Sequence, residues 1–195
     1  MAYTRTNLNA ANPAVANRFV ASVAMKNGAY TVANATMPTT PGGRFITVGH
    51  TATSTVDTLG VITVTGTGLR GETISEVITP VNGTTATGVK PFVTVTGVVG
   101  SGWASVAGDD LIVVGAAAGS IVLPMSGTLF AVVVNTTAAG TITLADAGGP
   151  IAVLKTSIVE NTYYYQVATA GFLRVTLTAA SDVTIIHSFN TDLQS

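Results

Sequence analysis

The 195-residue chain contains no cysteine, and only 9% of its residues are charged. An average soluble domain carries roughly 25% charged residues. The lack of cysteine excludes disulfide bonds, thiolate metal sites and cysteine nucleophiles. The net charge is −1, and the eight lysine and arginine residues are scattered along the chain, so no basic region attracts nucleic acid or anionic lipid. We therefore expect neither nucleic acid nor a membrane among its partners.

Long apolar segments are also missing. The longest, residues 111–125, is interrupted by Gly115, Gly119, Ser120 and Pro124. It falls short of the roughly 20 apolar residues that span a membrane as a helix. The first residues, MAYTRTNLN, lack the apolar centre of a signal peptide. The sequence predicts a soluble chain that is made in a cytoplasm without a signal peptide.

Short β-branched runs fill the chain from residue 44 onward. Examples are RFITVGH, GVITVTG, KPFVTVTGVV, TLFAVVVNT and SDVTIIHSF, each bounded by glycine, proline, asparagine or aspartate. Ile62 and Val64 alternate with Thr63 and Thr65, which is the period of a half-buried strand. Runs that recur about every ten residues favour sandwiches or barrels. The predicted fold class is all-β.

The predicted organisation is two small β-sandwich or barrel-like domains preceded by an extended N-terminal arm. The arm covers residues 1–43, the first domain 44–124 and the second 125–195. Asn12 and Pro13 could begin a short helix in the arm, as N-cap and first helical residue. The arm is either a loose terminus or a segment that becomes ordered across a neighbouring subunit.

A glycine-rich pattern, GTGLRG, spans residues 66–71 and matches G-x-G-x-x-G. In a dinucleotide-binding fold a helix follows this pattern, and an acidic residue lies about 20 positions later. Here the following residues, ETISEVITP, are typical of a strand, and residues 88–98 contain no acidic residue. We therefore predict no cofactor and interpret Gly66, Gly68 and Gly71 as glycines of a hairpin or bulge with positive φ. Asn82-Gly83 predicts a tight hairpin, with Gly83 as its turn glycine.

Paired carboxylates do not form a convincing catalytic set. Glu72 and Glu76 lie four residues apart, roughly 13 Å along a strand. Glycosidases hold their two carboxylates about 5 to 10 Å apart. We interpret both residues as exposed charges that keep a strand soluble. Asp109 and Asp110 are interpreted as turn residues before a strand.

The two histidines, His50 and His187, lie in no metal-binding or triad pattern, and no serine lies in a G-x-S-x-G elbow. His187 follows two isoleucines and is expected in a strand, as a partly buried or edge residue. The sequence therefore predicts no catalytic residue and no metal site, and the chain is not expected to be an enzyme.

Aromatic residues are the remaining candidates for contact with a partner. Tyr163 and Tyr165 point to one side of a strand and Tyr164 to the other. The pair either packs ordinarily in a sheet or forms a platform for a sugar or a subunit. Trp103 is flanked by small residues and is expected in a loop. The predicted interface residues are Arg5, Asn12, Arg18, Phe19, Trp103, Tyr163 and Tyr165.

Two parts of the sequence resemble structural proteins of tailed bacteriophages. GVITVTGTGLRGETISEVI, NGTTATGVKPFVTVTGV and LIVVG resemble a module of these virions, and TLFAVVVNTTAAGTITLADAGGPIAVL through SDVTIIHSF is similar to small β domains of head and tail accessory proteins. The likeness covers most of residues 44–189 and rests on turn chemistry. No catalytic residues come with it.

The resemblance implies a head decoration or cement protein on the capsid exterior of a virion that assembles in the host cytoplasm. Its partners would be the major capsid protein and copies of itself, and a trimer would suit three-fold positions on a shell. The alternative is a tail or adhesion component that binds a host surface glycan through Tyr163, Tyr165 or Trp103.

Overall fold

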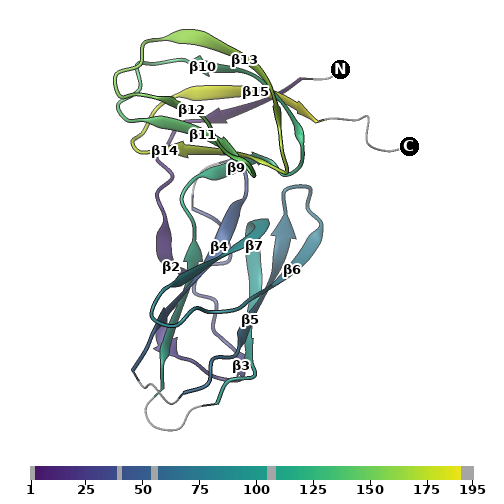
Figure 1. Cartoon of the computed structure of the whole chain (residues 1–195), viewed down its shortest axis with the longest axis vertical. Helices are drawn as coiled ribbons and strands as arrows, with labels where there is room; N and C mark the ends of the chain where they lie inside the picture. Colours follow the sequence, from purple (N-terminus) through teal and green to yellow (C-terminus); the bar gives the residue numbers. More distant parts are fainter. Residues whose placement is uncertain (1–2, 39–40, 54–56, 105–108, 190–195) are drawn as a thin grey trace, which may run out of the picture. The chain divides into compact units, whose positions relative to one another are not determined.

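The structure, a computed structural model, describes residues 3–38, 41–53, 57–104 and 109–189. These residues form fifteen β-strands and no helix (Figure 1). The strands are β1 (Thr4–Leu8), β2 (Val15–Ala24), β3 (Gly28–Ala29), β4 (Arg44–Thr51), β5 (Val61–Gly68), β6 (Thr73–Ile78), β7 (Thr85–Ser101), β8 (Leu111–Ala116), β9 (Ser120–Leu123), β10 (Gly127–Val134), β11 (Ile142–Asp146), β12 (Gly149–Leu154), β13 (Asn161–Thr169), β14 (Leu173–Leu177) and β15 (Val183–Phe189). The predicted all-β class is confirmed, and the helix predicted from Asn12 is wrong.

Unit 1, one of two compact units, consists of Met1–Pro13, Thr39–Gly42 and Ala118–Ser195. Its strands form two antiparallel sheets, in the orders β1-β15-β10-β13 and β12-β11-β14-β9 (Figure 1). Side chains from both sheets form one buried core, with Leu129 and Ile185 from the first sheet and Leu144 and Val175 from the second. Unit 1 is therefore a β-sandwich.

Unit 2 consists of Ala14–Pro38 and Gly43–Ala117. Its strands follow the order β2-β8-β4-β7-β5-β6, and β3 pairs with β7. The long strand β7 changes partner near Phe92: the residues before it pair with β4 and those after it with β5. Because β7 belongs to both halves, the sheet bends around a core that contains Phe19, Ile46 and Phe92.

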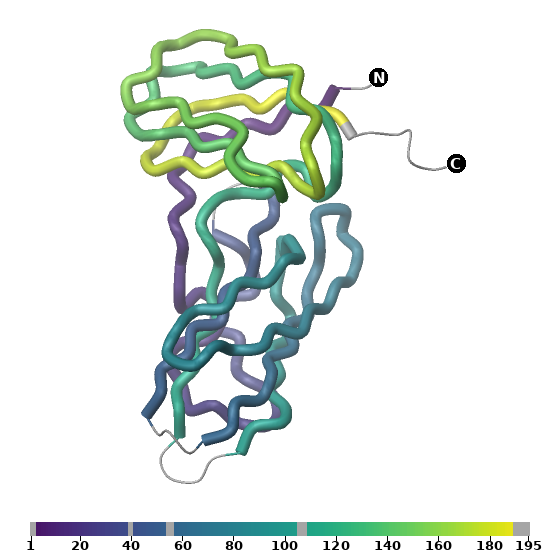
Figure 2. The backbone as a smooth tube through the Cα atoms, in the orientation of Figure 1, coloured from purple at the N-terminus to yellow at the C-terminus, as the bar shows by residue number. Residues whose placement is uncertain are grey.

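The N-terminal segment belongs to both units, contrary to the predicted arm. Residues 4–8 form an edge strand of unit 1 that pairs with β15, as Figure 2 shows where the purple start of the chain runs beside its yellow end. Residues 15–24 form an edge strand of unit 2 that pairs with β8. The predicted boundaries at residues 43 and 124 are replaced by those of the two units. Residues 1–2, 39–40 and 190–195, parts of the predicted arm and second domain, lie outside the described residues.

The glycine pattern at residues 66–71 joins two paired strands. β5 ends at Gly68, β6 starts at Thr73, and their residues pair from Ile62 with Ile78 to Thr67 with Thr73. No helix follows, so the interpretation as a hairpin is confirmed. Of the three glycines only Gly71 has a positive φ, +79°. Gly66 and Gly68 instead lie at register shifts between β5 and β7.

We expect Gly66→Ala to lower the free energy of unfolding of unit 2 by about 2 kcal/mol. A Cβ at this position would overlap the Thr94 carbonyl oxygen, and that backbone atom can move only if β7 moves. The control is Gly71→Ala, which meets open space but has a positive φ, so it should cost about 1 kcal/mol. Urea unfolding measures both; an equal or smaller loss for Gly66→Ala would contradict the packing argument.

Glu76 is part of the interior, contrary to the predicted exposed charge. It is 8% exposed. Its carboxylate accepts hydrogen bonds from the backbone N–H groups of Val89 at 2.6 Å and Lys90 at 3.3 Å. β6 is thus linked to β7 through a side chain, although the two strands are not neighbours in the sheet.

The hairpin predicted at Asn82-Gly83 is wrong, because the strands on either side of it, β6 and β7, do not pair with each other. The predicted turn is present, with a φ of +65° at Gly83.

Candidate functional site

Three predicted interface residues lie in the interior. Asn12 and Phe19 have no exposed surface, and Trp103 is 7% exposed. Phe19 and Trp103 pack in the core of unit 2, whereas the Asn12 side chain forms hydrogen bonds within unit 1. These three predictions are wrong. Arg18 is half-buried, and its Nε donates to the Thr36 carbonyl oxygen at 2.9 Å, which anchors it to its own unit.

Of the two alternatives for Tyr163 and Tyr165 of β13, the structure shows ordinary packing in the sheet rather than a platform. Tyr163 and Tyr165 are half-buried against the core of unit 1, and the Tyr163 hydroxyl donates to the Val159 carbonyl oxygen at 3.0 Å. Burial raises the pKa of the Tyr165 hydroxyl, and the neighbouring Tyr163 adds to this effect. Tyr164 points outward and is 78% exposed. The exposed aromatic residue of the triplet is therefore Tyr164.

Tyr164 lies at one end of a row that crosses the outer face of the first sheet. In the strand register it pairs with Ala131 of β10, Ala131 pairs with Ile186 of β15, and Ile186 pairs with Arg5 of β1. Arg5 is exposed, as the interface prediction required. The pairing therefore brings residues from the two ends of the chain onto one surface of unit 1.

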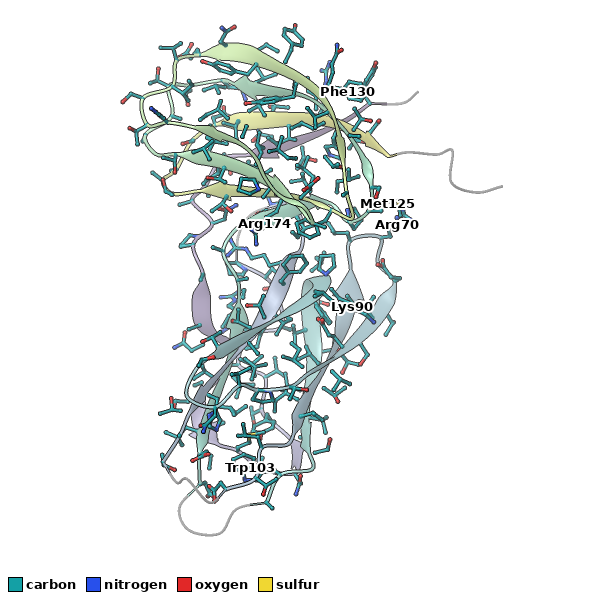
Figure 3. All side chains as sticks on the ribbon, viewed as in Figure 1. Arg70, Lys90, Trp103, Met125, Phe130 and Arg174 are labelled. Carbon is teal, nitrogen blue, oxygen red and sulfur yellow. The ribbon has the colours of Figure 1, made fainter. Side chains whose placement is uncertain are left out.

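A hollow of about 310 Å³ lies on this face. The residues that line it are Tyr3, Arg5, Phe130, Ala131, Tyr164, Gln166 and Ile186. The rings of Tyr3 and Phe130 meet edge to face, with their centroids 4.6 Å apart. Figure 3 labels Phe130 at the outer side of the sheet. We refer to these seven residues as the aromatic hollow.

Irregular pairing shapes the aromatic hollow. Phe130 is an extra residue relative to β15, because Leu129 pairs with His187 and Ala131 with Ile186. Opposite it on β13, Gln166 adopts a positive φ of +53°. A bulge bends a strand and redirects a side chain. The bulge therefore interrupts the regular alternation of side chains between the two faces of the sheet, and Phe130 and Gln166 lie beside Tyr164 in the hollow.

A polar cluster lies further along the same face. The side-chain amides of Asn7 and Asn135 both donate to Asp182 Oδ1, at 2.7 and 3.0 Å, and both also donate to the Thr184 hydroxyl. Hydrogen bonds to a carboxylate stabilise its charged form. The amides of Asn7 and Asn135 therefore hold the pKa of Asp182 below its usual value.

Replacing both Asn7 and Asn135 by alanine should raise the pKa of Asp182 toward its usual value. In the native protein the stabilisation from this depressed pKa is present above the unfolded-state pKa and is lost as the pH falls through the folded-state pKa. The double variant should therefore lose less stability on acidification. NMR titration of the Asp182 carboxyl carbon measures the shift, with Asn9→Ala as control. An unchanged midpoint would contradict the assigned cause.

His50 and Asp110 form a buried pair in unit 2. His50 Nε2 lies 3.1 Å from Asp110 Oδ2, and the backbone N–H of Gly83 donates to His50 Nδ1 at 3.1 Å. Because Nδ1 accepts a hydrogen bond, the ring proton is on Nε2 and is donated to Asp110. Both ring nitrogens are thus engaged by the protein itself, so His50 offers no nitrogen to a substrate as a general base. Asp110 lies directly before β8, as the sequence predicted, and is 2% exposed.

His187 lies in β15, as its sequence context predicted, but it is 1% exposed and β15 is not an edge strand, so the expectation of a partly buried or edge residue is wrong. Its Nε2 lies 3.1 Å from the Thr6 hydroxyl, and burial lowers the pKa of its imidazole. Within the described ranges no three histidine, aspartate or glutamate residues are grouped as they would be to hold a metal ion. No helix in the same ranges is long and apolar enough to cross a membrane.

No family model, no curated protein and no solved structure matches this chain. The candidate site therefore rests on its own geometry. Sequence reasoning missed Tyr3, Phe130, Tyr164 and Gln166. The one available signal was the strand alternation in TYYYQ, which groups Tyr164 apart from its neighbours but does not tell which side faces the core.

Proposed function

We propose that the protein is a structural component of a tailed-bacteriophage virion and that it decorates the capsid. The observation that carries this proposal is the low charge of the chain, in which 9% of the residues are charged. Large apolar side chains are exposed in both units, among them Val77, Val89 and Val159, with exposed fractions of 61%, 76% and 61%. Exposed valines that are scattered singly are normal for a protein surface, so it is the low charge that favours a surface covered by neighbours in an assembly.

The local structure of the segments that resemble tailed-bacteriophage structural proteins also supports the proposal. The TGTGLRGETISE segment is a strand, a turn and a strand, and the LIVVG segment is the start of β8. The two units are antiparallel β structures without a catalytic constellation among the described residues. A protein of this kind acts mechanically: each copy adds buried surface between capsid subunits.

Weak individual contacts are sufficient for this role, because many copies act on the same shell. The partners in this proposal are the major capsid protein and further copies of the chain, arranged as a trimer at three-fold positions. The virion exterior is the corresponding location. Polar threonine and asparagine side chains can form hydrogen bonds at such contacts without burying unpaired charges.

Stripped and restored particles test the proposal. Virions are freed of this protein, heated in steps and assayed for genome release, and the purified chain is then added back. We expect release at a lower temperature from stripped particles and recovery on addition, with hundreds of copies bound per particle. Unchanged release, or about a dozen copies or fewer, would refute capsid decoration.

A further inference from the structure

We propose that the aromatic hollow is a binding site for a saccharide that carries a carboxylate. The site lies wholly in unit 1 and is independent of the capsid contact proposed above. It differs from the glycan site expected from the sequence, because Tyr163, Tyr165 and Trp103 are turned into the protein. The exposed residues that replace them are Tyr3, Arg5 and Tyr164.

The first argument is the combination of ring faces with hydrogen-bond donors. A sugar ring has apolar C–H faces and a polar edge, so it is recognised by aromatic rings with amides or guanidinium groups beside them. Tyr164 is 78% exposed and Tyr3 is 61% exposed. Gln166 supplies an amide and Arg5 a guanidinium at the margin of the same hollow. A volume of about 310 Å³ is at the lower end for ligand sites, which suits one or two sugar rings.

The second argument is charge. The hollow is lined by one arginine and by no acidic residue. Within the described residues no carboxylate forms a salt bridge with Arg5. A guanidinium offers two parallel N–H groups to a carboxylate. Arg5 therefore favours an acidic sugar, such as a uronic or sialic acid, over a neutral one.

Other ligand classes fit less well. An extended peptide binds by adding a strand at a sheet edge, whereas the hollow lies over the face of the sheet, across β15 and β10, which are paired on both sides. Single-stranded nucleic acid also stacks on aromatic rings, but it needs a groove rich in positive charge. The hollow contains a single basic residue. A short acidic saccharide matches both the volume of the hollow and its single positive charge.

The test uses the full chain and a panel of immobilised oligosaccharides that end in glucuronic, galacturonic or N-acetylneuraminic acid. Each is paired with its carboxyl-reduced counterpart, and oligothymidylate is included. We expect binding to at least one acidic saccharide, weakened by added salt, and at least about tenfold weaker binding to its reduced form.

Two variants with matched controls locate the site. Tyr164→Ala should weaken binding at least about tenfold, whereas Val153→Ala, an exposed residue of β12, should not. Arg5→Gln should abolish the preference for the acid, whereas Lys155→Gln, an exposed cation of the same unit, should keep it. The proposal is overturned if no acidic saccharide binds, if oligothymidylate binds better, or if Tyr164→Ala binds normally. Genome retention in heated particles is a separate readout, so the two proposals fail independently.

Discussion

Replacing Asp110 by alanine is expected to lower the free energy of unfolding of unit 2 by about 3 kcal/mol. Asp110 is 2% exposed and joins two parts of the chain that are distant in sequence. Its Oδ2 accepts the proton of His50 Nε2, and its Oδ1 accepts from the Thr53 backbone N–H at 2.6 Å. Without the carboxylate, the buried N–H of His50 has lost its acceptor, and that loss accounts for most of the cost.

Asp110→Asn separates the contribution of hydrogen bonding to the free energy of unfolding from that of side-chain shape, because asparagine has nearly the same shape as aspartate. The amide has one oxygen, so one of the two donors, at His50 or at Thr53, must face the amide N–H₂ group instead. Shifting the imidazole proton to Nδ1 does not help, because Nδ1 faces the N–H of Gly83. Every arrangement leaves two donors in contact, and we expect a loss of about 2 kcal/mol despite the unchanged volume.

Fluorescence of Trp103 can measure the unfolding of unit 2 in these variants. Trp103 is the single tryptophan of the chain, it is buried in unit 2, and its ring centroid lies 6.4 Å from that of His50. Urea unfolding followed by tryptophan fluorescence therefore reports on the region of the substitution. The control is Asp109→Ala, whose side chain is exposed and next in sequence. Equal effects of the two substitutions would show that the buried pair contributes nothing specific.

The strands after residue 44 could be predicted because local patterns determine them. Alternation such as Ile62, Thr63 and Val64 places every second side chain in a core, and glycine pairs mark the turns. The same local logic identified residues 66–71 as a hairpin. It could not reveal that Gly66 is required by the close approach of Thr94, because that contact joins strands 28 residues apart in the sequence.

Local sequence patterns did not predict the strand formed by the N-terminal segment. Residues 4–8 pair with β15, at the other end of the chain, and the apolar content of TRTNL gives no sign of it. Its one inward apolar residue, Leu8, is completely buried. An edge strand is stabilised by backbone hydrogen bonds to its neighbour, and those depend on the whole fold rather than on local sequence.

Only part of the candidate site could be predicted from the sequence. Arg5 was expected at a surface and lies there, but the exposed tyrosine is the one that the sequence argument left out. Alternation separates Tyr164 from its neighbours, yet only the second sheet of the sandwich determines which side is buried. The bulge at Phe130 then adds a residue that no alternation rule places outward.

Asn12→Ala is expected to lower the free energy of unfolding of unit 1 by about 4 kcal/mol. Asn12 is completely buried. Its Oδ1 accepts from the Leu177 backbone N–H at 2.6 Å, and its Nδ2 donates to the Val175 carbonyl oxygen at 2.9 Å and to the Ser120 hydroxyl at 3.1 Å. β9 pairs with β14 only as far as Val175, and the Asn12 side chain continues the hydrogen bonding of β14 beyond that point.

Alanine at position 12 leaves a buried N–H and a buried C=O of β14 without a partner, which is why the expected cost exceeds that of one ordinary hydrogen bond. Asn12→Asp keeps the shape but turns a carboxylate oxygen toward the Val175 carbonyl, so it should be destabilising as well. Asn9→Ala, an exposed asparagine three residues earlier, should change stability by less than about 0.5 kcal/mol. Hydrogen exchange at the Leu177 amide reads out the effect: it should become fast in Asn12→Ala and stay slow in Asn9→Ala. Retained protection in Asn12→Ala would mean that water or a rearranged backbone replaces the asparagine side chain at the Leu177 N–H.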